Sequence, residues 1–357
     1  MIDIDIVPFN AQTASKDEWT CFLEFRRKRW AEHSPGDPIY ADKLFRTWLR
    51  EIEERDFVTE AHAVFETENP KTQIGVLRLA FYKEDSPSYK GNEKSCHVFD
   101  LAVLRPYRRK GIGQKLLPLV WEFARKHDKP LVIGSTQEED GKAFLRKMAA
   151  QEALDAVESR LYLNKVNWEM IENWAKEGPK RSPNSRIEFF SSVPEEIIDP
   201  YCEIFTETLN QAPRQDLQVG DDIMTPEFRR KLEEDFRKNK AQWMTLITRE
   251  ENGDISGLTE MNYHPERHNM IEQLLTGVQE KYRGSGKGKW LKALMLLKIR
   301  KEFPQVEIVT TGNATTNEPM LAINQRLGFK KHKEWIVGQI SVEKIEGFLA
   351  KNGLDER

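Results

Sequence analysis

Two six-residue stretches decide how this chain folds. They are Arg108-Arg109-Lys110-Gly111-Ile112-Gly113 and Arg283-Gly284-Ser285-Gly286-Lys287-Gly288, and both have the form Arg-x-x-Gly-x-Gly. Each follows a strand-like run, ending at Val103 or Val278, and precedes a segment with apolar residues at helical spacing. Glycines at these positions let backbone N–H groups approach an anion, and the following helix contributes the positive end of its dipole. The sequence therefore predicts two anion-binding turns suited to a pyrophosphate.

The same order of elements surrounds both turns. Strands are expected at 2–7, 62–65, 75–82 and 96–103 in the first half, and at 186–190, 243–248, 257–263 and 271–278 in the second. In each half the third strand opens with a glycine and the fourth leads into the turn. A repeat of this length indicates domain duplication rather than a solenoid of short repeats.

The length of the chain also favours two domains, because 357 residues exceed the size at which a single core usually stops growing. We expect an N-terminal domain at 1–166, a linker at 167–185 and a C-terminal domain at 186–357. The linker would hold a short helix followed by a polar connector punctuated by Pro179 and Pro183. A surface loop within one domain is the alternative interpretation of this connector.

Composition excludes several classes of protein. The net charge is -3, so no overall basic field points to nucleic acid, and no apolar run is long enough for a membrane span. The start of the chain alternates like a strand, and we expect a cytoplasmic protein. Three scattered cysteines predict free thiols. His264 and His268 have no evident third ligand, so no metal is expected.

The paired turns resemble those of the GCN5-related N-acetyltransferase (GNAT) superfamily, whose matching motif cradles the pyrophosphate of coenzyme A. The resemblance covers nearly the whole chain, and the two-domain layout looks like that of the mycothiol-synthase type. It implies an α/β (α+β) fold of two tandem GNAT domains, each a mixed, mostly antiparallel central sheet flanked by helices. A dinucleotide fold is disfavoured, because neither turn shows Gly-x-Gly-x-x-Gly after the first strand of a βαβ unit.

The resemblance implies acetyl-CoA as the co-substrate and indicates which residues bind it. In the C-terminal copy these are Thr276, Gly277, Val278, Arg283, Gly284, Ser285, Gly286, Lys287, Gly288 and Asn317, and in the N-terminal copy Val103, Arg108, Arg109, Lys110, Gly111, Ile112 and Gly113. In the family, the asparagine matching Asn317 bonds the pantetheine arm. Capping of the next helix explains Asn317 equally well. The Gly328-Phe329 pair that ends this helix is a hallmark of the fold.

The two copies differ where the helix after the turn region begins and ends. Matching by order of elements places Glu138 against Asn317, Leu145 against Asn324, and Ala149-Ala150 against Gly328-Phe329. A carboxylate does not donate a hydrogen bond as an amide does, so the cofactor wall of the N-terminal copy is expected to be eroded. We therefore assign the chemistry to the C-terminal copy.

Asn324 also takes a catalytic position, where the family often has a tyrosine that protonates the departing thiolate. An amide cannot act as a general acid, so the proton must come from elsewhere or from water. Tyr263, Tyr282 and Cys202 are the alternatives.

Attack of an amine on a thioester needs a free lone pair, and hence a base. Glu272 occupies a position that resembles the catalytic glutamate of several family members, and Glu260 on the preceding strand is the alternative. Strand alternation predicts that Glu272 shares a face with Leu274 and Thr276. A structural surface carboxylate is an equal interpretation of Glu272. In the N-terminal copy His97 matches Glu272, and it is a secondary candidate for a base.

These features predict an acyl-CoA-dependent N-acetyltransferase that transfers acetyl directly to a primary amine of a small molecule, with a glutamate or water as general base. The alternative is a non-catalytic acyl-CoA-binding or sensor protein. Nucleic-acid binding through Arg105 and the first turn is disfavoured, because the same side chains suit cofactor phosphates. We expect no nucleic-acid or membrane partner and either a monomer or a homodimer.

Overall fold

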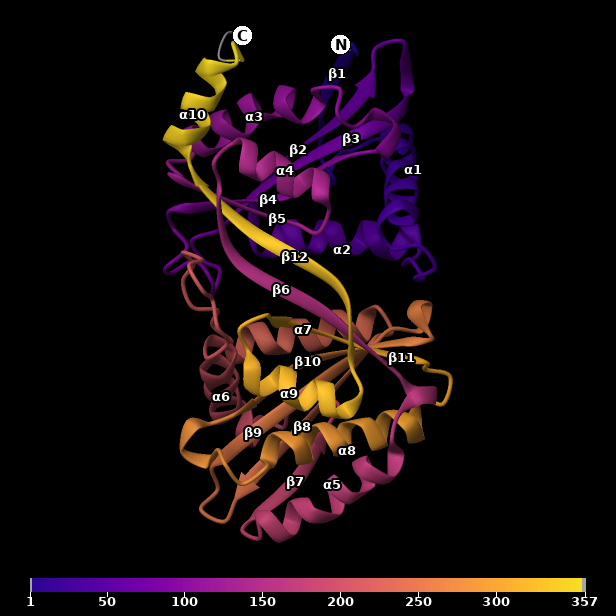
Figure 1. Cartoon of the computed structure of the whole chain (residues 1–357), viewed down its shortest axis with the longest axis vertical. Helices are drawn as coiled ribbons and strands as arrows, with labels where there is room; N and C mark the ends of the chain where they lie inside the picture. Colours follow the sequence, from indigo (N-terminus) through magenta and orange to yellow (C-terminus); the bar gives the residue numbers. More distant parts are fainter. Residues whose placement is uncertain (1, 355–357) are drawn as a thin grey trace. The chain divides into compact units, whose positions relative to one another are not determined.

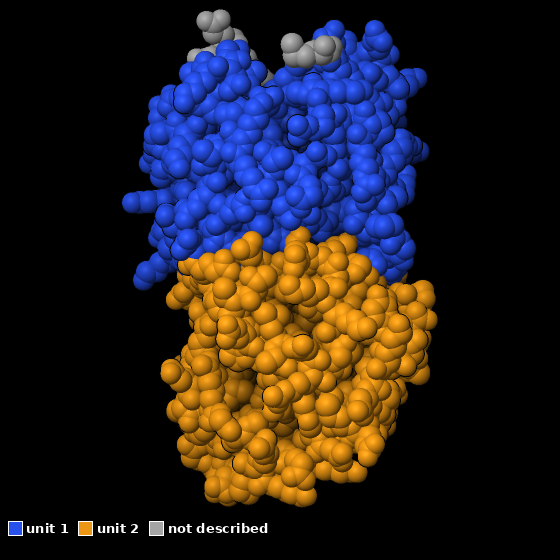
Figure 2. All heavy atoms as spheres, in the orientation of Figure 1, with its two compact units in different colours: residues 1–154, 216–220, 335–357 blue, residues 155–215, 221–334 orange. Residues whose placement is uncertain are grey.

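A computed structural model describes residues 2–354 (Figure 1), and these residues form two compact units. Unit 1 comprises residues 2–154, 216–220 and 335–354, and unit 2 comprises residues 155–215 and 221–334 (Figure 2). The predicted domains at 1–166 and 186–357 follow the two sequence repeats, but they do not coincide with these units. The difference arises because each repeat contributes segments to both units.

The two repeats contain the same elements in the same order. The first consists of β1 (Ile4–Phe9), α1 (Lys16–His33), α2 (Asp42–Arg55), β2 (Phe57–Glu66), β3 (Asn69–Tyr82), β4 (Ser95–Val103), α3 (Ile112–Lys126), β5 (Leu131–Thr136), α4 (Glu139–Lys147), β6 (Gln151–Tyr162) and α5 (Trp168–Arg181). The second consists of β7 (Ser185–Phe190), α6 (Ile198–Asn210), α7 (Pro226–Lys238), β8 (Gln242–Glu250), β9 (Ile255–Tyr263), β10 (Met270–Val278), α8 (Lys287–Glu302), β11 (Ile308–Ala314), α9 (Glu318–Leu327), β12 (Lys330–Ser341) and α10 (Val342–Lys351). The predicted duplication is confirmed.

Each unit is built on a sheet of the same topology. The strand order is β1-β2-β3-β4-β5-β12 in unit 1 and β7-β8-β9-β10-β11-β6 in unit 2. The pairs β4–β5 and β10–β11 are parallel, whereas the other recorded pairs are antiparallel. The mixed, mostly antiparallel sheet is therefore confirmed for both copies. Among residues 2–354, no helix is both long and apolar enough to cross a membrane.

The last strand and last helix of each repeat are exchanged. Residues Ile336–Ser341 of β12 pair with β5 in unit 1, and residues Ala156–Tyr162 of β6 pair with β11 in unit 2. The helices follow their strands, since α10 packs on α3 and α5 packs on α8. Sequence alone could not show this, because either strand has an alternation that fits either sheet.

The predicted linker at 167–185 is wrong. Residues Trp168–Arg181 form one helix, which Asn167 caps by accepting a hydrogen bond from the backbone N–H of Met170 at 3.0 Å. The helix continues through Pro179, which the connector prediction treated as a break. Burial of its apolar face against α8 outweighs the loss of one backbone hydrogen bond at the proline.

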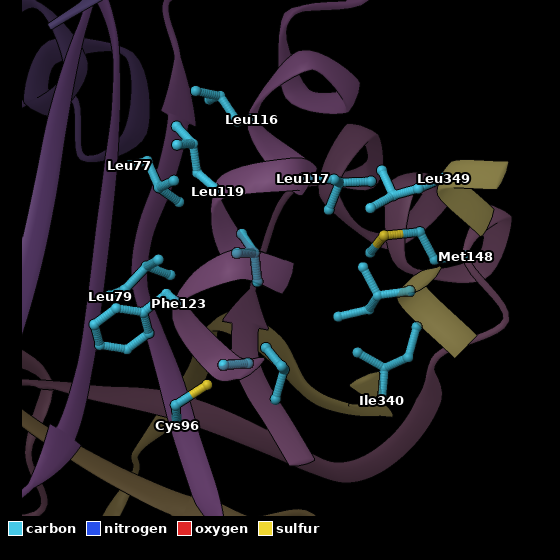
Figure 3. Close-up of a cluster of buried hydrophobic side chains, with 14 of the residues drawn as sticks. Leu77, Leu79, Cys96, Leu116, Leu117, Leu119, Phe123, Met148, Ile340 and Leu349 are labelled. Atoms are coloured by element: carbon cyan, nitrogen blue, oxygen red, sulfur yellow. The ribbon is translucent and has the colours of Figure 1, made fainter. Parts of the chain in front are cut away.

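Exchanged residues fill the core of each unit. In unit 1, Figure 3 shows Ile340 of β12 and Leu349 of α10 within the cluster that contains Leu117 and Phe123 of α3. In unit 2, Leu161 of β6 and other exchanged apolar residues pack with the buried face of α8. Burying a side chain of this size stabilises a fold by about 1.5–3 kcal/mol. Each core therefore depends on side chains from both repeats.

Contact between α5 and α8 is close enough to require a glycine. A Cβ atom added at Gly178 would lie 2.2 Å from Cγ of Trp290. We expect Gly178→Ala to lower the free energy of unfolding by about 1–3 kcal/mol through overpacking, despite the better helix propensity of alanine. The matched control is Gly347→Ala in α10, where an added Cβ meets no atom within 4 Å, and it should stabilise slightly. Chemical denaturation measures the free energy of unfolding of both variants. A Gly178→Ala variant that is more stable than wild type would contradict the close packing of α5 on α8.

Candidate functional site

The two Arg-x-x-Gly-x-Gly turns share one backbone conformation. Gly111 and Gly286 each begin a helix with a φ of 86°, and the residues two positions earlier, Arg109 and Gly284, have φ values of 61° and 89°. Glycine enters this left-handed region at little steric cost, whereas an arginine is strained there. The second turn therefore has the more relaxed backbone, as expected for the better-preserved copy.

The first arginine of each motif fastens its turn to the preceding strand. Nε of Arg108 donates to the carbonyl oxygen of Val103 at 2.8 Å, and Nε of Arg283 donates to that of Val278 at 3.1 Å. Lys287 is also held within the protein, because its Nζ lies 3.2 Å from Oγ of Ser285 and forms an ion pair with Glu250. The second turn therefore offers mainly its backbone N–H groups to an anion.

Before the second turn, β10 separates from its parallel neighbour. Within residues 2–354, β10 pairs with β11 only over Met270–Glu272, although β10 continues to Val278. The register with β9 also shifts between Gln273 and Thr276, which marks a β-bulge. Backbone groups of β10 beyond Glu272 therefore have no ladder with β11, and this open edge leads directly to the turn.

The bulge overturns the predicted facing of Glu272. Gln273 and Thr276 both bond Thr259 on β9, with Nε2 of Gln273 at 3.3 Å and Oγ1 of Thr276 at 2.7 Å from its Oγ1. Glu272 instead lies beside Asn262, whose side chain points to the other face of β9. Glu272 and Thr276 therefore lie on opposite faces of the sheet, because the extra residue of the bulge breaks strict alternation.

Helix α9 begins and ends as the sequence predicts. The side chain of Asn317 caps it by accepting from the backbone N–H of Met320 at 3.4 Å, so the capping interpretation of Asn317 is confirmed. Gly328 ends the helix with a φ of 97°. The backbone N–H of Phe329 then donates to the carbonyl of Asn324 at 3.0 Å.

A buried amide lies inside this helix end. Nδ2 of Asn324 donates to Oδ1 of Asn313 on β11 at 2.9 Å, whereas Oδ1 of Asn324 is buried without a hydrogen-bond partner among the described residues. A buried polar atom without a partner is costly unless water or a ligand satisfies it. Asn324 therefore holds an unused hydrogen-bond acceptor beside β11, the strand from which β10 separates after Glu272.

In unit 1 the corresponding groups are paired with one another. Glu138 precedes α4 as Asn317 precedes α9, and Ala149, with a φ of 54°, takes the place of Gly328. Glu138 accepts from Nη1 of Arg29 at 2.7 Å and from Nη1 of Arg108, which also forms an ion pair with Glu32. Burial raises the pKa of Glu138, but these hydrogen bonds and charges outweigh it, and the net pKa is lowered.

Beside the turn of unit 2, the charged side chains are cations that lack the carboxylate partners found in unit 1. Arg181 at the end of α5, Lys289 in the first turn of α8 and Arg326 near the end of α9 have no ion pair among the described residues. Nη1 of Arg181 would lie 3.2 Å from a Cβ at Gly286, which places this guanidinium against the turn. Desolvation, and then the charges of Arg326 and Arg181, lower the pKa of Lys289. The three cations are therefore near neighbours without an ion pair of their own, although the charge of Arg181 also acts on Glu177, which is paired with Lys180.

Glu272 lies where β10 and β11 separate. Glu272 is an exposed residue, and among residues 2–354 its only recorded hydrogen bond comes from Nδ2 of Asn262 at a long 3.4 Å. Desolvation by the surrounding protein raises its pKa, which the charge of Arg267 partly offsets. A carboxylate with a raised pKa and few partners is suited to accept a proton.

Glu260 is instead part of a buried network that the sequence did not predict. Its Oε1 accepts from Nη1 of Arg229 at 2.7 Å, from Oγ1 of Thr245 at 2.8 Å and from the hydroxyl of Tyr201. Both charged side chains are fully buried, and Arg229 also pairs with Glu233. A fully buried carboxylate that already accepts from three donors is out of reach of an incoming amine, so the geometry disfavours Glu260 as the alternative base.

Lys292 is a second group that the sequence analysis missed. It is fully buried on α8, and its Nζ contacts only Oε1 of Gln273, at 2.9 Å, among recorded hydrogen bonds. Desolvation lowers its pKa to about 7. The first repeat has the core leucine Leu117 at the same place in α3, so comparison of the repeats would have revealed this lysine.

The other proton-transfer candidates are poorly placed or already bonded. Burial raises the pKa of Cys202 to about 12, and the hydroxyl of Tyr263 accepts from Gln305 at 2.8 Å within the core. The Tyr282 hydroxyl donates to Asp254 at 2.7 Å beside the turn. In unit 1, burial lowers the pKa of His97 to about 4, so this side chain is neutral at physiological pH.

Comparison with known proteins agrees with this geometry. Residues 22–148 match the family model described as the acetyltransferase (GNAT) family, and no curated protein matches the chain. The matched region lies in the first repeat, although the second has glycine at both left-handed positions of its turn. A tandem GNAT protein from the clavulanic acid biosynthesis pathway has a TM-score of 0.72 at 21% identity, covering 95% of this chain and 99% of that one.

Two further solved structures are similar in fold to this chain over nearly its whole length. A GCN5-related N-acetyltransferase from Sphaerobacter thermophilus has a TM-score of 0.62 at 15% identity, with 95% and 96% coverage. A glucosamine N-acetyltransferase region of a fungal multi-domain β-N-acetylglucosaminidase has a TM-score of 0.63 at 13% identity, covering 95% of this chain and 38% of that one. The chain therefore has the fold of tandem GNAT proteins. The family match covers part of the first repeat, and the fold match covers both repeats.

The buried lysine makes a prediction about stability. Because the folded pKa of Lys292 is about 7 against an ordinary 10.5, the unfolded state binds more protons between these values, and stability should rise with pH across that window. Relative to Lys292→Leu, the wild type should gain up to about 5 kcal/mol from pH 7 to pH 10.5. The control is Lys298→Leu, near the other end of α8. Chemical denaturation at several pH values measures the free energy of unfolding of each protein. A difference between wild type and Lys292→Leu that stays the same from pH 7 to pH 10.5 would contradict the lowered pKa of Lys292.

Proposed function

We propose that unit 2 binds acetyl-CoA at the turn from Arg283 to Gly288 and transfers the acetyl group to a primary amine of a small molecule. The observation that carries this assignment is the contrast between the two turns. They share a backbone conformation, but in unit 1 the motif arginine Arg108 is paired with Glu138 and Glu32, whereas in unit 2 three cations without an ion pair lie beside the turn. The cations of the second turn are therefore the more available to a polyanionic ligand.

Several features of unit 2 fit the rest of such a ligand. Backbone N–H groups of the turn and the start of α8 suit a pyrophosphate. The open edge of β10 runs from that turn towards Glu272, so it can bond an extended arm through its backbone groups. The unused Oδ1 of Asn324 is an acceptor for an amide N–H of the arm. Unit 1 lacks such an acceptor, because Leu145 occupies that position.

Glu272 is the proposed base in this reaction. It accepts a proton from the acceptor amine, directly or through water, and the amine nitrogen then forms the new C–N bond as the thioester C–S bond breaks. The departing thiolate takes a proton from water or another donor, because the Asn324 amide cannot supply one. The solvent-accessible position of Glu272 on the face opposite Lys292 leaves it available to an incoming amine.

A sensor that binds acyl-CoA without turnover is the second candidate. Asn324, which stands where the family often has a proton donor, favours it. Release of thiol from acetyl-CoA in the presence of an amine panel separates the two functions. Amine-dependent release supports the transferase, and tight binding without release supports the sensor.

The turn assignment predicts a difference between two equivalent glycines. Gly286→Val should weaken acetyl-CoA binding at least 100-fold, because a β-branched residue resists a φ of 86° and would also crowd Arg181. Gly111→Val is the matched control, since Gly111 has the same φ in unit 1, and it should leave binding nearly unchanged. Calorimetry on the folded variants measures the affinity of each for acetyl-CoA. Equal losses in both would show that the wrong copy was chosen.

The base assignment predicts a selective loss of turnover. Glu272→Gln should lower kcat by roughly 10²–10⁴-fold with acetyl-CoA affinity near that of wild type, because a positioned base acts on the reaction step alone. Activity should rise with pH through the raised pKa of Glu272 or that of the bound amine, whichever is higher. His97→Gln, at the matching position of unit 1, is the control. Full activity of Glu272→Gln with a good substrate would leave this carboxylate without a catalytic role.

A further inference from the structure

The three cations beside the second turn come from three different helices. Arg181 ends α5, Lys289 lies in α8 and Arg326 lies near the end of α9. Their neighbourhood follows from the packing of these helices on one another, since Gly178 of α5 lies against α8 and a Cβ at Gly288 would lie 3.6 Å from Ile323 of α9. The cluster is therefore produced by the tertiary structure and not by a basic run in the sequence.

The cluster of Arg181, Lys289 and Arg326 adds positive charge to a turn whose backbone N–H groups and helix N-terminus already suit a pyrophosphate. Arg283, the arginine of the motif, is already bonded to Val278 and to Gln211, and Lys287 is paired with Glu250. Arg181 and Arg326 are exposed and Lys289 is half-buried, and none has a carboxylate partner among the described residues. Glu177 feels the charge of Arg181 but is already paired with Lys180. Like charges repel one another, so three neighbouring cations with no ion pair of their own favour an added anion of high charge.

Other groups at this place agree with an anion site. Nζ of Lys289 lies 5.5 Å from the ring centre of Trp174, which fixes where the ammonium group projects. In unit 1 the residue matching Lys289 is the neutral Gln114, and acidic side chains crowd the turn instead. The cation cluster is thus particular to the second turn.

We propose that Arg181, Lys289 and Arg326 form a subsite for a phosphomonoester, and that through it unit 2 selects the 3′-phosphorylated nucleotide of coenzyme A over forms that lack this group. A phosphomonoester carries a charge of about -1.5 to -2 at neutral pH, which complements three cations. The proposal rests on the proposed function, because it concerns the nucleotide end of the same ligand. Arg181 comes from the exchanged helix, so the first repeat supplies part of a site in the second.

The test compares binding of coenzyme A and dephospho-coenzyme A to the full chain by calorimetry. Wild type should bind coenzyme A at least about 10-fold more tightly, since each charge-assisted contact contributes about 1.5 kcal/mol or more. The double variant Arg181→Gln/Arg326→Gln should bind coenzyme A and dephospho-coenzyme A with affinities that differ by less than about threefold, because any weakening at the pyrophosphate lowers both affinities alike. An unchanged far-ultraviolet circular dichroism spectrum shows that the variant is folded. A folded variant that binds neither nucleotide would overturn the subsite, because the cations would then serve the whole ligand and not the phosphomonoester. The control Lys298→Gln, on α8 but away from the turn, should keep the full preference.

The outcomes separate the subsite from the proposed function. Equal binding of the two nucleotides by wild type, or a preference that survives in the double variant, would overturn the subsite while leaving acyl-CoA binding intact. Failure of both nucleotides to bind wild type would overturn the proposed function and the subsite together. A preference that disappears in the double variant and persists in the control establishes the subsite.

Discussion

The structure depends on the reciprocal exchange of the last strand and helix between the two repeats. Without Ile336–Ser341, β5 would be an open edge strand, and without Ala156–Tyr162 the same would hold for β11. The exchanged helices complete the arrangement, because α10 covers α3 and α5 covers α8. Neither repeat can bury its own core by itself. The two repeats therefore fold as one coupled unit, through strand pairings between residues far apart in sequence.

Exchange also shapes the candidate site. Arg181 arrives at the second turn only because α5 packs on α8, and Gly178 is the close contact that makes this packing possible. The turn itself needs two residues in the left-handed region, which glycine supplies at both positions in the second repeat but at only one in the first. Identical backbones then carry different electrostatics, since unit 1 holds Glu138 where unit 2 holds Asn317. The charge of the side chains, not the shape of the turn, distinguishes the copies.

The sheet of unit 2 carries buried charge on both faces. Arg229 and Glu260 form an ion pair on one face, and Lys292 lies on the other with Gln273 as its partner. Burial of charge is expensive, and the ion pair is compensated by direct hydrogen bonds, whereas the lysine responds with a lowered pKa. Glu260 is thereby fixed as a structural carboxylate. The solvent-accessible Glu272 is left as the carboxylate available for proton transfer.

The sequence by itself determined the duplication, the order of elements, both turns and the glycine that ends α9. These features are local, because they depend on short-range periodicity and on the backbone freedom of glycine. Only the tertiary structure decided which repeat completes which sheet, since either strand alternation satisfies either sheet. It also decided the bulge that turns Thr276 away from Glu272, the burial of Glu260 and Lys292, and the gathering of Arg181, Lys289 and Arg326. These depend on the three-dimensional neighbours of each side chain, which are separated from it by many residues of chain.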